Sequence, residues 1–334
     1  MGLRCAFFGS DGVSLPTFQK LHQALSTPLL SSLTLFTPQY PSKVRSKSVP
    51  PPEVVVYAKE HKVPFHLVPT EIDARKAFWM EFTPRLAVSH DLGVAVSFGQ
   101  RLPPALLTAM RHGCINMHPS LLPEYRGAAP ITWALIDGVE KSGVTVLEMT
   151  AGRFDSGPIL GQRSIKVPPG ATNASLSAEL AEAGACLMLD CIRYLPVARS
   201  TARLQDESQA STAPKIHGGH ACINFAEWDS RQLVRRHVAL QDTHHLHAFV
   251  GGKRMIFFSL EHAGTGPSFK QPPSEKWVAG CLVRYRNELF LYCKDERWVR
   301  CNLLMYEGGK KPLTAEEFIN GHMKPQNKLI IQLE

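Results

Sequence analysis

The stretch Gly113–Pro130, GCINMHPSLLPEYRGAAP, decides how the rest of the chain is organised. It opens with the apolar pair Cys114-Ile115, which is typical of the end of a buried strand. Asn116 and His118 follow two positions apart, and side chains with that spacing point to the same side of an extended backbone. Prolines stiffen the next segment, before a predicted helix from Ala129 to Asp137. The stretch therefore predicts an amide and an imidazole that project together from a strand tip.

A carboxylate joins them later in the chain, at Asp155 in RFDSGPIL. An amide can donate to a developing oxyanion, an imidazole can move a proton, and a carboxylate can orient the imidazole or accept a proton from an amine. Asn116, His118 and Asp155 therefore suit the transfer of a carbonyl-bearing group. Ordinary interpretations stay open, because a histidine after a strand is often structural and Asp-Ser-Gly is common turn chemistry.

The first half of the chain alternates strand-like and helix-like segments. The predicted strands are Leu3–Phe8, Leu33–Phe36 and Leu92–Ser97, and the predicted helices are Leu15–Leu25, Val54–His61 and Asn173–Leu195. This alternation predicts an α/β domain with a largely parallel, doubly wound, Rossmann-like sheet. Ligands of such sheets bind beyond the carboxyl ends of the strands, where Ser97-Phe98-Gly99 and Asn116 to His118 both fall. No GxGxxG follows the first strand, so a dinucleotide site is not indicated.

The polar, aperiodic stretch from Pro196 to Pro214 predicts an interdomain linker. After it come a helix capped by Asp229 or Ser230 and several short strand-like runs with polar turns, which predict a small antiparallel β-barrel. We therefore expect one domain over residues 1–196, a linker over 197–213 and a second domain over 214–334.

Composition limits the classes of partner. The net charge is +8, with 19 Lys and Arg against 15 Asp and Glu in the first 200 residues and 18 against 14 in the remainder, so each part carries +4. This balance favours polyanions without identifying one. No apolar run reaches the length of a membrane span, and the cysteines form no CxxC pair, so we expect no membrane insertion, no metal and a reducing compartment.

The motif Asn116-x-His118-x-Ser120-Leu121-Leu122-Pro123, followed by Arg126-Gly127 and Asp155-Ser156-Gly157, resembles that of the folate-dependent formyltransferases. The resemblance runs from the first strand to the C-terminus, and it favours the members that act on methionyl-tRNA in mitochondria. It implies a formyltransferase domain followed by an OB-like barrel that binds tRNA.

The resemblance also implies substrates and roles. It implies 10-formyltetrahydrofolate as donor, the amino group of methionyl-initiator tRNA as acceptor, and a monomer. Asn116 and protonated His118 would stabilise the tetrahedral oxyanion, and Asp155 would help to remove the amine proton. The residues expected to frame the folate are Ser97, Phe98, Gly99, Leu102, Ser120, Leu121, Leu122 and Pro123.

A proline-bracketed basic loop lies between Pro38 and Pro52, PQYPSKVRSKSVPPP. Proline confines such a loop without a folded core, and its cations point outward. The resemblance implies that Lys43, Arg45 and Lys47 engage the acceptor stem, with Arg126 as a further tRNA contact. A basic surface loop without a ligand is the ordinary interpretation, and Arg126 could be a simple exposed cation.

Alternatives stay open at this point. The central motif is shared with enzymes that formylate glycinamide ribonucleotide or hydrolyse folate, although these leave the C-terminal barrel unexplained. A catalytically silent RNA-binding relative is a third hypothesis. The sequence carries no Arg-rich leader, so either the leader is missing from it or the compartment is the cytoplasm rather than the mitochondrial matrix.

Overall fold

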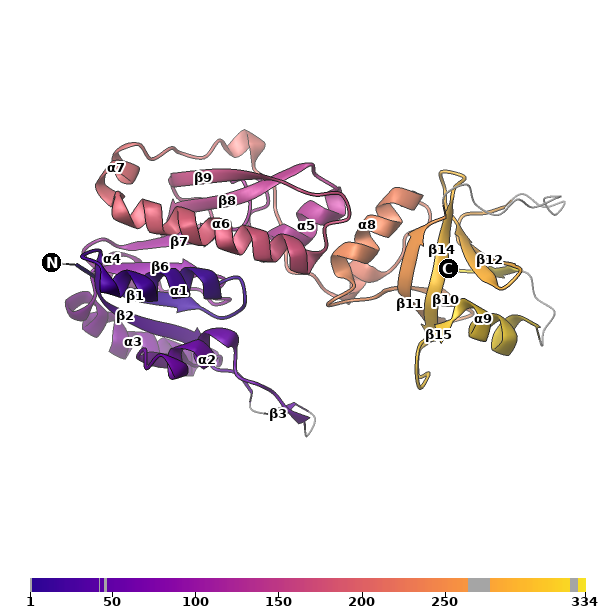
Figure 1. Ribbon diagram of the computed structural model, residues 1–334, viewed down its shortest axis with the longest axis horizontal. Helices are drawn as coiled ribbons and strands as arrows, with labels where there is room; N and C mark the ends of the chain where they lie inside the picture. Colours follow the sequence, from indigo (N-terminus) through magenta and orange to yellow (C-terminus); the bar gives the residue numbers. More distant parts are fainter. Residues whose placement is uncertain (1, 42, 45–46, 264–276, 325–329) are drawn as a thin grey trace. The chain divides into compact units, whose positions relative to one another are not determined.

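The structure is a computed structural model that describes residues 2–41, 43–44, 47–263, 277–324 and 330–334 (Figure 1). It divides into two compact units. The first comprises Met1–Ile131, Glu140–Pro168 and Ala174–Pro214, and the second comprises Thr132–Val139, Pro169–Asn173 and Lys215–Glu334. The segment that we predict as a linker, residues 197–213, thus falls inside the first compact unit.

The first unit is built on a seven-stranded sheet in the order β5-β2-β1-β6-β7-β8-β9. Its strands are β1 (Leu3–Gly9), β2 (Leu30–Pro38), β5 (Phe65–Val68), β6 (Leu92–Val96), β7 (Cys114–His118), β8 (Lys141–Glu148) and β9 (Ile159–Lys166). Neighbours from β5 to β7 pair in parallel, whereas β8 and β9 are antiparallel. The predicted Rossmann-like sheet is confirmed, with an antiparallel extension at one edge.

Helices cover both faces of this sheet, and strand β1 shows why. Successive side chains of a strand point to opposite faces, and both must be buried. Phe7 stacks on Phe18 at 5.2 Å, whereas Phe8 contacts Trp79 at 6.0 Å on the other face. The α-helices of this unit in the described ranges are α1 (Leu15–Gln23), α2 (Glu53–Glu60), α3 (Ile72–Ser89), α4 (Pro104–Ala109), α6 (Asn173–Arg193) and α7 (Leu195–Ser200), whereas most of α5 (Pro130–Asp137) belongs to the second unit.

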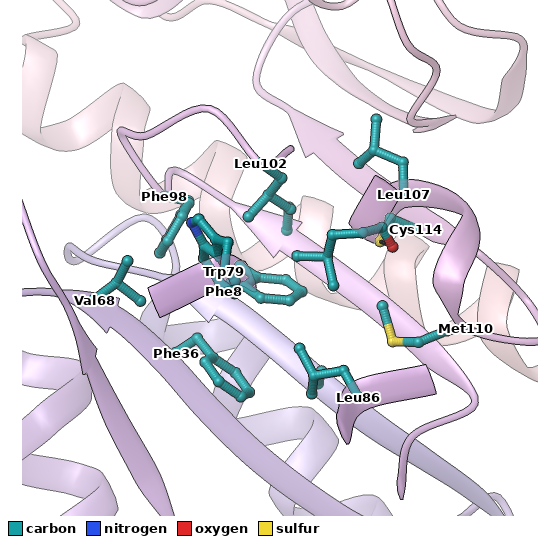
Figure 2. Packing of buried hydrophobic residues seen from close by; sticks show 13 residues of the cluster. Phe8, Phe36, Val68, Trp79, Leu86, Phe98, Leu102, Leu107, Met110 and Cys114 are labelled. Atoms are coloured by element: carbon teal, nitrogen blue, oxygen red, sulfur yellow. Dashed lines mark hydrogen bonds between the residues drawn. The ribbon is translucent and has the colours of Figure 1, made fainter. Parts of the chain in front are cut away.

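The core beneath α3 and α4 is aromatic and reaches the carboxyl end of β6 (Figure 2). Phe8 and Phe98 meet edge to face at 5.7 Å, and Leu102 packs in the same cluster. Phe98 is 5% exposed. Its ring, which we expected at the folate, therefore anchors the loop after β6 in the core.

The second unit contains a barrel of antiparallel strands in the order β10-β11-β14-β13-β12-β16, with β15 paired to β14. The strands are β10 (Leu246–Val250), β11 (Lys253–His262), β12 (Cys281–Tyr285), β13 (Glu288–Tyr292), β14 (Trp298–Tyr306), β15 (Leu313–Thr314) and β16 (Ile330–Gln332), and the helices are α8 (Ser230–Leu240) and α9 (Ala315–Phe318). Phe249 and Glu334 exchange two main-chain hydrogen bonds of 3.1 and 2.8 Å. These bonds join the two ends of the strand path, so the predicted small barrel is confirmed.

The predicted start of α8 is also confirmed. Asp229 is its N-cap, and its carboxylate accepts from the amide of Gln232 while the Gln232 side chain accepts from the amide of Asp229. Such a capping box satisfies two amides at a helix start. Of the helices in the described ranges, none is both long enough and apolar enough to cross a membrane.

Candidate active site

Asn116, His118 and Asp155 meet at the carboxyl end of β7, as the sequence predicts. The amide nitrogen of Asn116 lies 3.4 Å from Oδ1 of Asp155, and Nδ1 of His118 lies 3.7 Å from Oδ2 of the same carboxylate. The main-chain amide of Gly127 donates to Oδ2 at 3.1 Å. Both carboxylate oxygens of Asp155 thus face the two side chains that β7 presents on one side of the sheet.

The hydrogen bonds of His118 fix which ring nitrogen faces the site. Nε2 lies 2.8 Å from the main-chain carbonyl of Tyr125. Because a carbonyl oxygen can only accept, Nε2 carries a hydrogen, and Nδ1 is the nitrogen directed at Asp155. The imidazole is only 4% exposed, so its orientation is set by these two contacts and by packing.

Left-handed backbone conformations gather around this site. Ser97, Tyr125 and Asp155 have φ of 47°, 58° and 54°. Non-glycine residues adopt this conformation at a cost, and functional sites are where such strain collects. Ser97 is held there by its neighbours, because its hydroxyl donates to Asp11 at 2.5 Å and its carbonyl accepts from the hydroxyl of Ser10.

A narrow hollow opens beside Asn116 and Asp155. Its lining consists of Gln100, Arg101, Leu102, Pro104, Leu107, Asn116 and residues 147–157, and it encloses about 60 Å³. Arg101 spans it, since its guanidinium donates to the carbonyl of Gly152 at 3.2 Å and lies 5.4 Å from the ring of Phe154. The loop of residues 149–157 therefore forms one wall of the hollow, and Arg101 on the opposite wall contacts it. The sequence alone did not predict this contact.

Among the residues expected to frame a folate, Leu102 lines this hollow, whereas Ser120 and Leu122 pack elsewhere. The Ser120 carbonyl accepts from the hydroxyl of Thr145 at 2.7 Å, and the Leu122 amide donates to the same hydroxyl at 3.1 Å. Leu122 is buried against Leu147. These contacts fasten the turn Ser120–Pro123 to β8, so the structure gives this turn a scaffolding role.

Arg126 is engaged inside the first unit. Its guanidinium donates to Gln205 at 2.6 and 3.0 Å and pairs with Glu207 at 2.9 Å, and its side chain is 10% exposed. A guanidinium with these partners is not the simple exposed cation that the sequence left open. Its predicted contact with tRNA would require the pair with Glu207 to open.

The basic loop is described only in part. Lys43 lies in β3 (Lys43–Val44) and Lys47 in β4 (Lys47–Ser48), which pair in an antiparallel hairpin. Arg45 lies outside the described residues. The expected contact of Lys43, Arg45 and Lys47 with tRNA stays a prediction. Across the described ranges, no group of three or more His, Cys, Asp or Glu could hold a metal ion.

Comparison with known proteins places this geometry in a family. Residues 3–192 match the formyl transferase model, and residues 215–323 match the model of the formyl transferase C-terminal domain. The chain is 30% identical over 328 residues to the mitochondrial methionyl-tRNA formyltransferase of Homo sapiens, covering 96% of this chain and 78% of that one. It is also 30% identical over 328 residues to the methionyl-tRNA formyltransferase of Geobacter sulfurreducens, covering 98% and 97%.

Solved structures agree on the fold. HypX from Aquifex aeolicus in complex with tetrahydrofolic acid superposes with a TM-score of 0.55 at 16% identity, covering 97% of this chain and 48% of that one. This identity shows a shared fold only. With matches over both halves and full-length relatives at 30% identity, the chain belongs to the formyl transferase family.

Proposed function

We propose that this protein transfers a formyl group from 10-formyltetrahydrofolate to the amino group of methionyl-initiator tRNA. The observation that carries the proposal is the convergence of Asn116, His118 and Asp155 beside the hollow. The relatives named as methionyl-tRNA formyltransferases support the choice of acceptor, because one of them matches almost the whole chain, including the barrel.

The donor belongs at the hollow next to Asn116. The apolar side chains Leu102 and Leu107 suit a flat heterocycle, and a protein of the same fold has been solved with tetrahydrofolic acid. The enclosed volume of about 60 Å³ is well below the roughly 300 Å³ or more of ligand pockets. The folate therefore enters only when the contacts of Arg101 with Gly152 and Phe154 open.

The three polar residues divide the chemistry. As the amine attacks the formyl carbon, negative charge grows on the formyl oxygen, and Asn116 donates its amide N–H there. His118 holds a proton on Nε2 against Tyr125 and presents Nδ1 toward the same region, where a second proton would add a charged donor. Asp155 accepts the proton that the attacking amine loses. The new C–N bond to the acceptor gives a tetrahedral intermediate, and its collapse breaks the bond to the folate nitrogen, which takes up the proton held by Asp155.

The barrel and the basic loop bind the phosphates of the tRNA in this proposal. Lys43, Arg45 and Lys47 supply three positive charges within five positions of the sequence. Several barrel cations are already ion-paired, as Arg254 is with Glu307 and Arg300 with Glu288, so the loop carries more of the proposed phosphate contact. We expect the protein to act as a monomer. The human relative is named as mitochondrial, which supports the mitochondrial matrix as the compartment, with the cytoplasm as the alternative.

One assay separates the possible acceptors. Purified protein is incubated with labelled 10-formyltetrahydrofolate and either methionyl-initiator tRNA or glycinamide ribonucleotide. Label on methionyl-tRNA alone supports the proposal. Label on glycinamide ribonucleotide, release of free formate, or no turnover with either acceptor would each contradict it.

A further inference from the structure

Gln205 contacts the loop that carries Asp155 from a distant part of the chain. Its Nε2 donates to the main-chain carbonyls of Asp155 and Gly157, both at 2.8 Å. We propose that Gln205 is a positioning residue, which holds the Asp155 carboxylate where His118 and Asn116 can use it. This inference rests on the proposed function for the role of Asp155.

The oxygen of the Gln205 side-chain amide is hydrogen-bonded as well. Oε1 accepts from Nε of Arg126 at 3.0 Å and from Nη2 at 2.6 Å, and Arg126 in turn pairs with Glu207. An amide with both ends bonded has a single orientation. Arg126 therefore orients Gln205 so that its NH₂ group, rather than its oxygen, faces the two carbonyls.

Gln205 belongs to a return segment, residues 203–213, that is fastened to the turn after His118. The amide of Arg126 donates to the carbonyl of Ser211 at 2.9 Å, and the amide of Ala213 donates to the carbonyl of Arg126 at 2.7 Å. Gly127 has φ of 128°, and a Cβ there would lie 2.6 Å from the Ala213 carbonyl oxygen. The close approach of the return segment therefore requires glycine at this position.

The return segment thus bonds to both halves of the site. One half is the turn that supplies the Tyr125 carbonyl to His118 and the Gly127 amide to Asp155, and the other is the Asp155 loop itself. Asp155 has a left-handed backbone, and a Cβ on Gly157 would lie 1.8 Å from the Glu148 carbonyl oxygen. A conformation of this kind persists only when its surroundings over-determine it. The two hydrogen bonds from Gln205 supply part of that constraint.

The consequence is a specific effect on catalysis. Oδ2 of Asp155 lies 3.7 Å from Nδ1 of His118, so a small shift of the loop separates the carboxylate from the imidazole. Misplacement of a reacting group by about 1 Å can cost on the order of 100-fold in rate. We expect kcat to fall about 10- to 100-fold without Gln205, while the KM for the folate changes by less than about threefold, because Gln205 does not line the hollow.

Two substitutions at one position test this. Gln205→Glu keeps an acceptor for Arg126 but removes the NH₂ group and brings a carboxylate toward two carbonyls, whereas Gln205→Ala removes both ends. Gln209→Ala is the matched control, because Gln209 is an exposed residue of the same type on the same segment and bonds locally to Asp206. Each variant is measured for kcat and KM on methionyl-tRNA, for the Kd of a folate analogue, for thermal unfolding and for hydrogen exchange of residues 151–157.

The expected result is a 10- to 100-fold loss of kcat and faster exchange of residues 151–157 in both Gln205 variants, with the folate Kd and the melting transition close to those of Gln209→Ala. Turnover of Gln205→Glu within about twofold of the control would overturn the proposal. So would a joint loss of folate binding and of the melting transition, because that result assigns Gln205 to stability alone. Failure of the wild-type protein to formylate methionyl-tRNA would instead reject the proposed function, while the hydrogen-exchange comparison would still report on the loop.

Discussion

Nδ1 of His118 lies 3.7 Å from Oδ2 of Asp155, while the opposite ring nitrogen is held by the carbonyl of Tyr125 at 2.8 Å. The imidazole therefore lies between the Tyr125 carbonyl and the Asp155 carboxylate. The position of that carboxylate depends in turn on hydrogen bonds from Gly127 and Gln205. Any change that moves one of these partners alters what the ring can do to a substrate.

Asn116 is expected to act only in the transition state. Asn116→Ala should lower kcat about 10²- to 10³-fold, the usual loss when an oxyanion donor is removed. Folate affinity should stay within about threefold, and folding should persist because Asn116 lines the hollow. Asn302→Ala, which removes an amide bonded to Glu261 on the barrel, is the control. Steady-state kinetics decide, and equal turnover of the two variants would remove Asn116 from the mechanism.

Arg101 is expected to hold the hollow closed. Its hydrogen bond to Gly152 and its contact with Phe154 each contribute about 1 kcal/mol to the closed form. Arg101→Leu should therefore tighten the binding of a folate analogue, by up to about 30-fold, and speed its association. A fluorescence titration with stopped-flow mixing measures both quantities. Weaker binding would show that Arg101 contacts the ligand rather than gating it.

The basic loop is expected to act on tRNA alone. Replacing Lys43, Arg45 and Lys47 by Gln should raise the KM for tRNA and reduce the slope of log KM against log salt concentration. The reason is that tRNA binding releases fewer counterions when fewer phosphates are contacted. The same number of charges removed at Lys62, Lys76 and Arg85, which are exposed elsewhere in the first unit, gives the control. Folate Kd should not change in either variant. An unaltered salt slope in the loop variant would leave the loop without a role in tRNA binding.

In the described parts of the fold, the features that depend on residues close together in the sequence could be predicted. Period-two spacing put Asn116 and His118 on one side of β7, and the capping pattern narrowed the N-cap of α8 to Asp229 or Ser230, of which the structure has Asp229. Helix α3 gave no comparable signal, because Pro84 lies inside it and prolines usually end helices. The role of Gln205 could not be predicted either. Gln205 lies in a stretch without periodicity, and it bonds to the carbonyl of a residue 50 positions earlier in the chain. Contacts of that range depend on the completed fold.

Low pH should lower the free energy of unfolding of the second unit, because His237 takes up a proton more readily in the unfolded chain. Burial lowers the pKa of this α8 imidazole to about 4, and its Nδ1 has no hydrogen-bond partner among the described residues. A depressed folded-state pKa contributes stability that is fully present above the unfolded value near 6.5 and is lost as the pH falls toward 4. The loss should be on the order of 3 kcal/mol.

Urea unfolding of the barrel, followed between pH 7.5 and 4, measures this loss. His237→Leu should flatten the pH dependence in that window, because the residue can no longer bind a proton. His262→Leu, at the exposed end of β11, is the control and should keep the wild-type slope. If His237→Leu unfolds with the same pH dependence as the wild type, another group is responsible.

We propose that His118 works with Asn116 and Asp155 in formyl transfer to methionyl-tRNA. Single-turnover transfer of labelled formyl from 10-formyltetrahydrofolate, measured for the wild type and for His118→Ala at saturating folate and tRNA, tests it most directly. We expect rapid labelling of methionyl-tRNA by the wild type and a rate about 10²- to 10³-fold lower for His118→Ala, with folate affinity retained. A His118→Ala rate within about twofold of the wild type would contradict it.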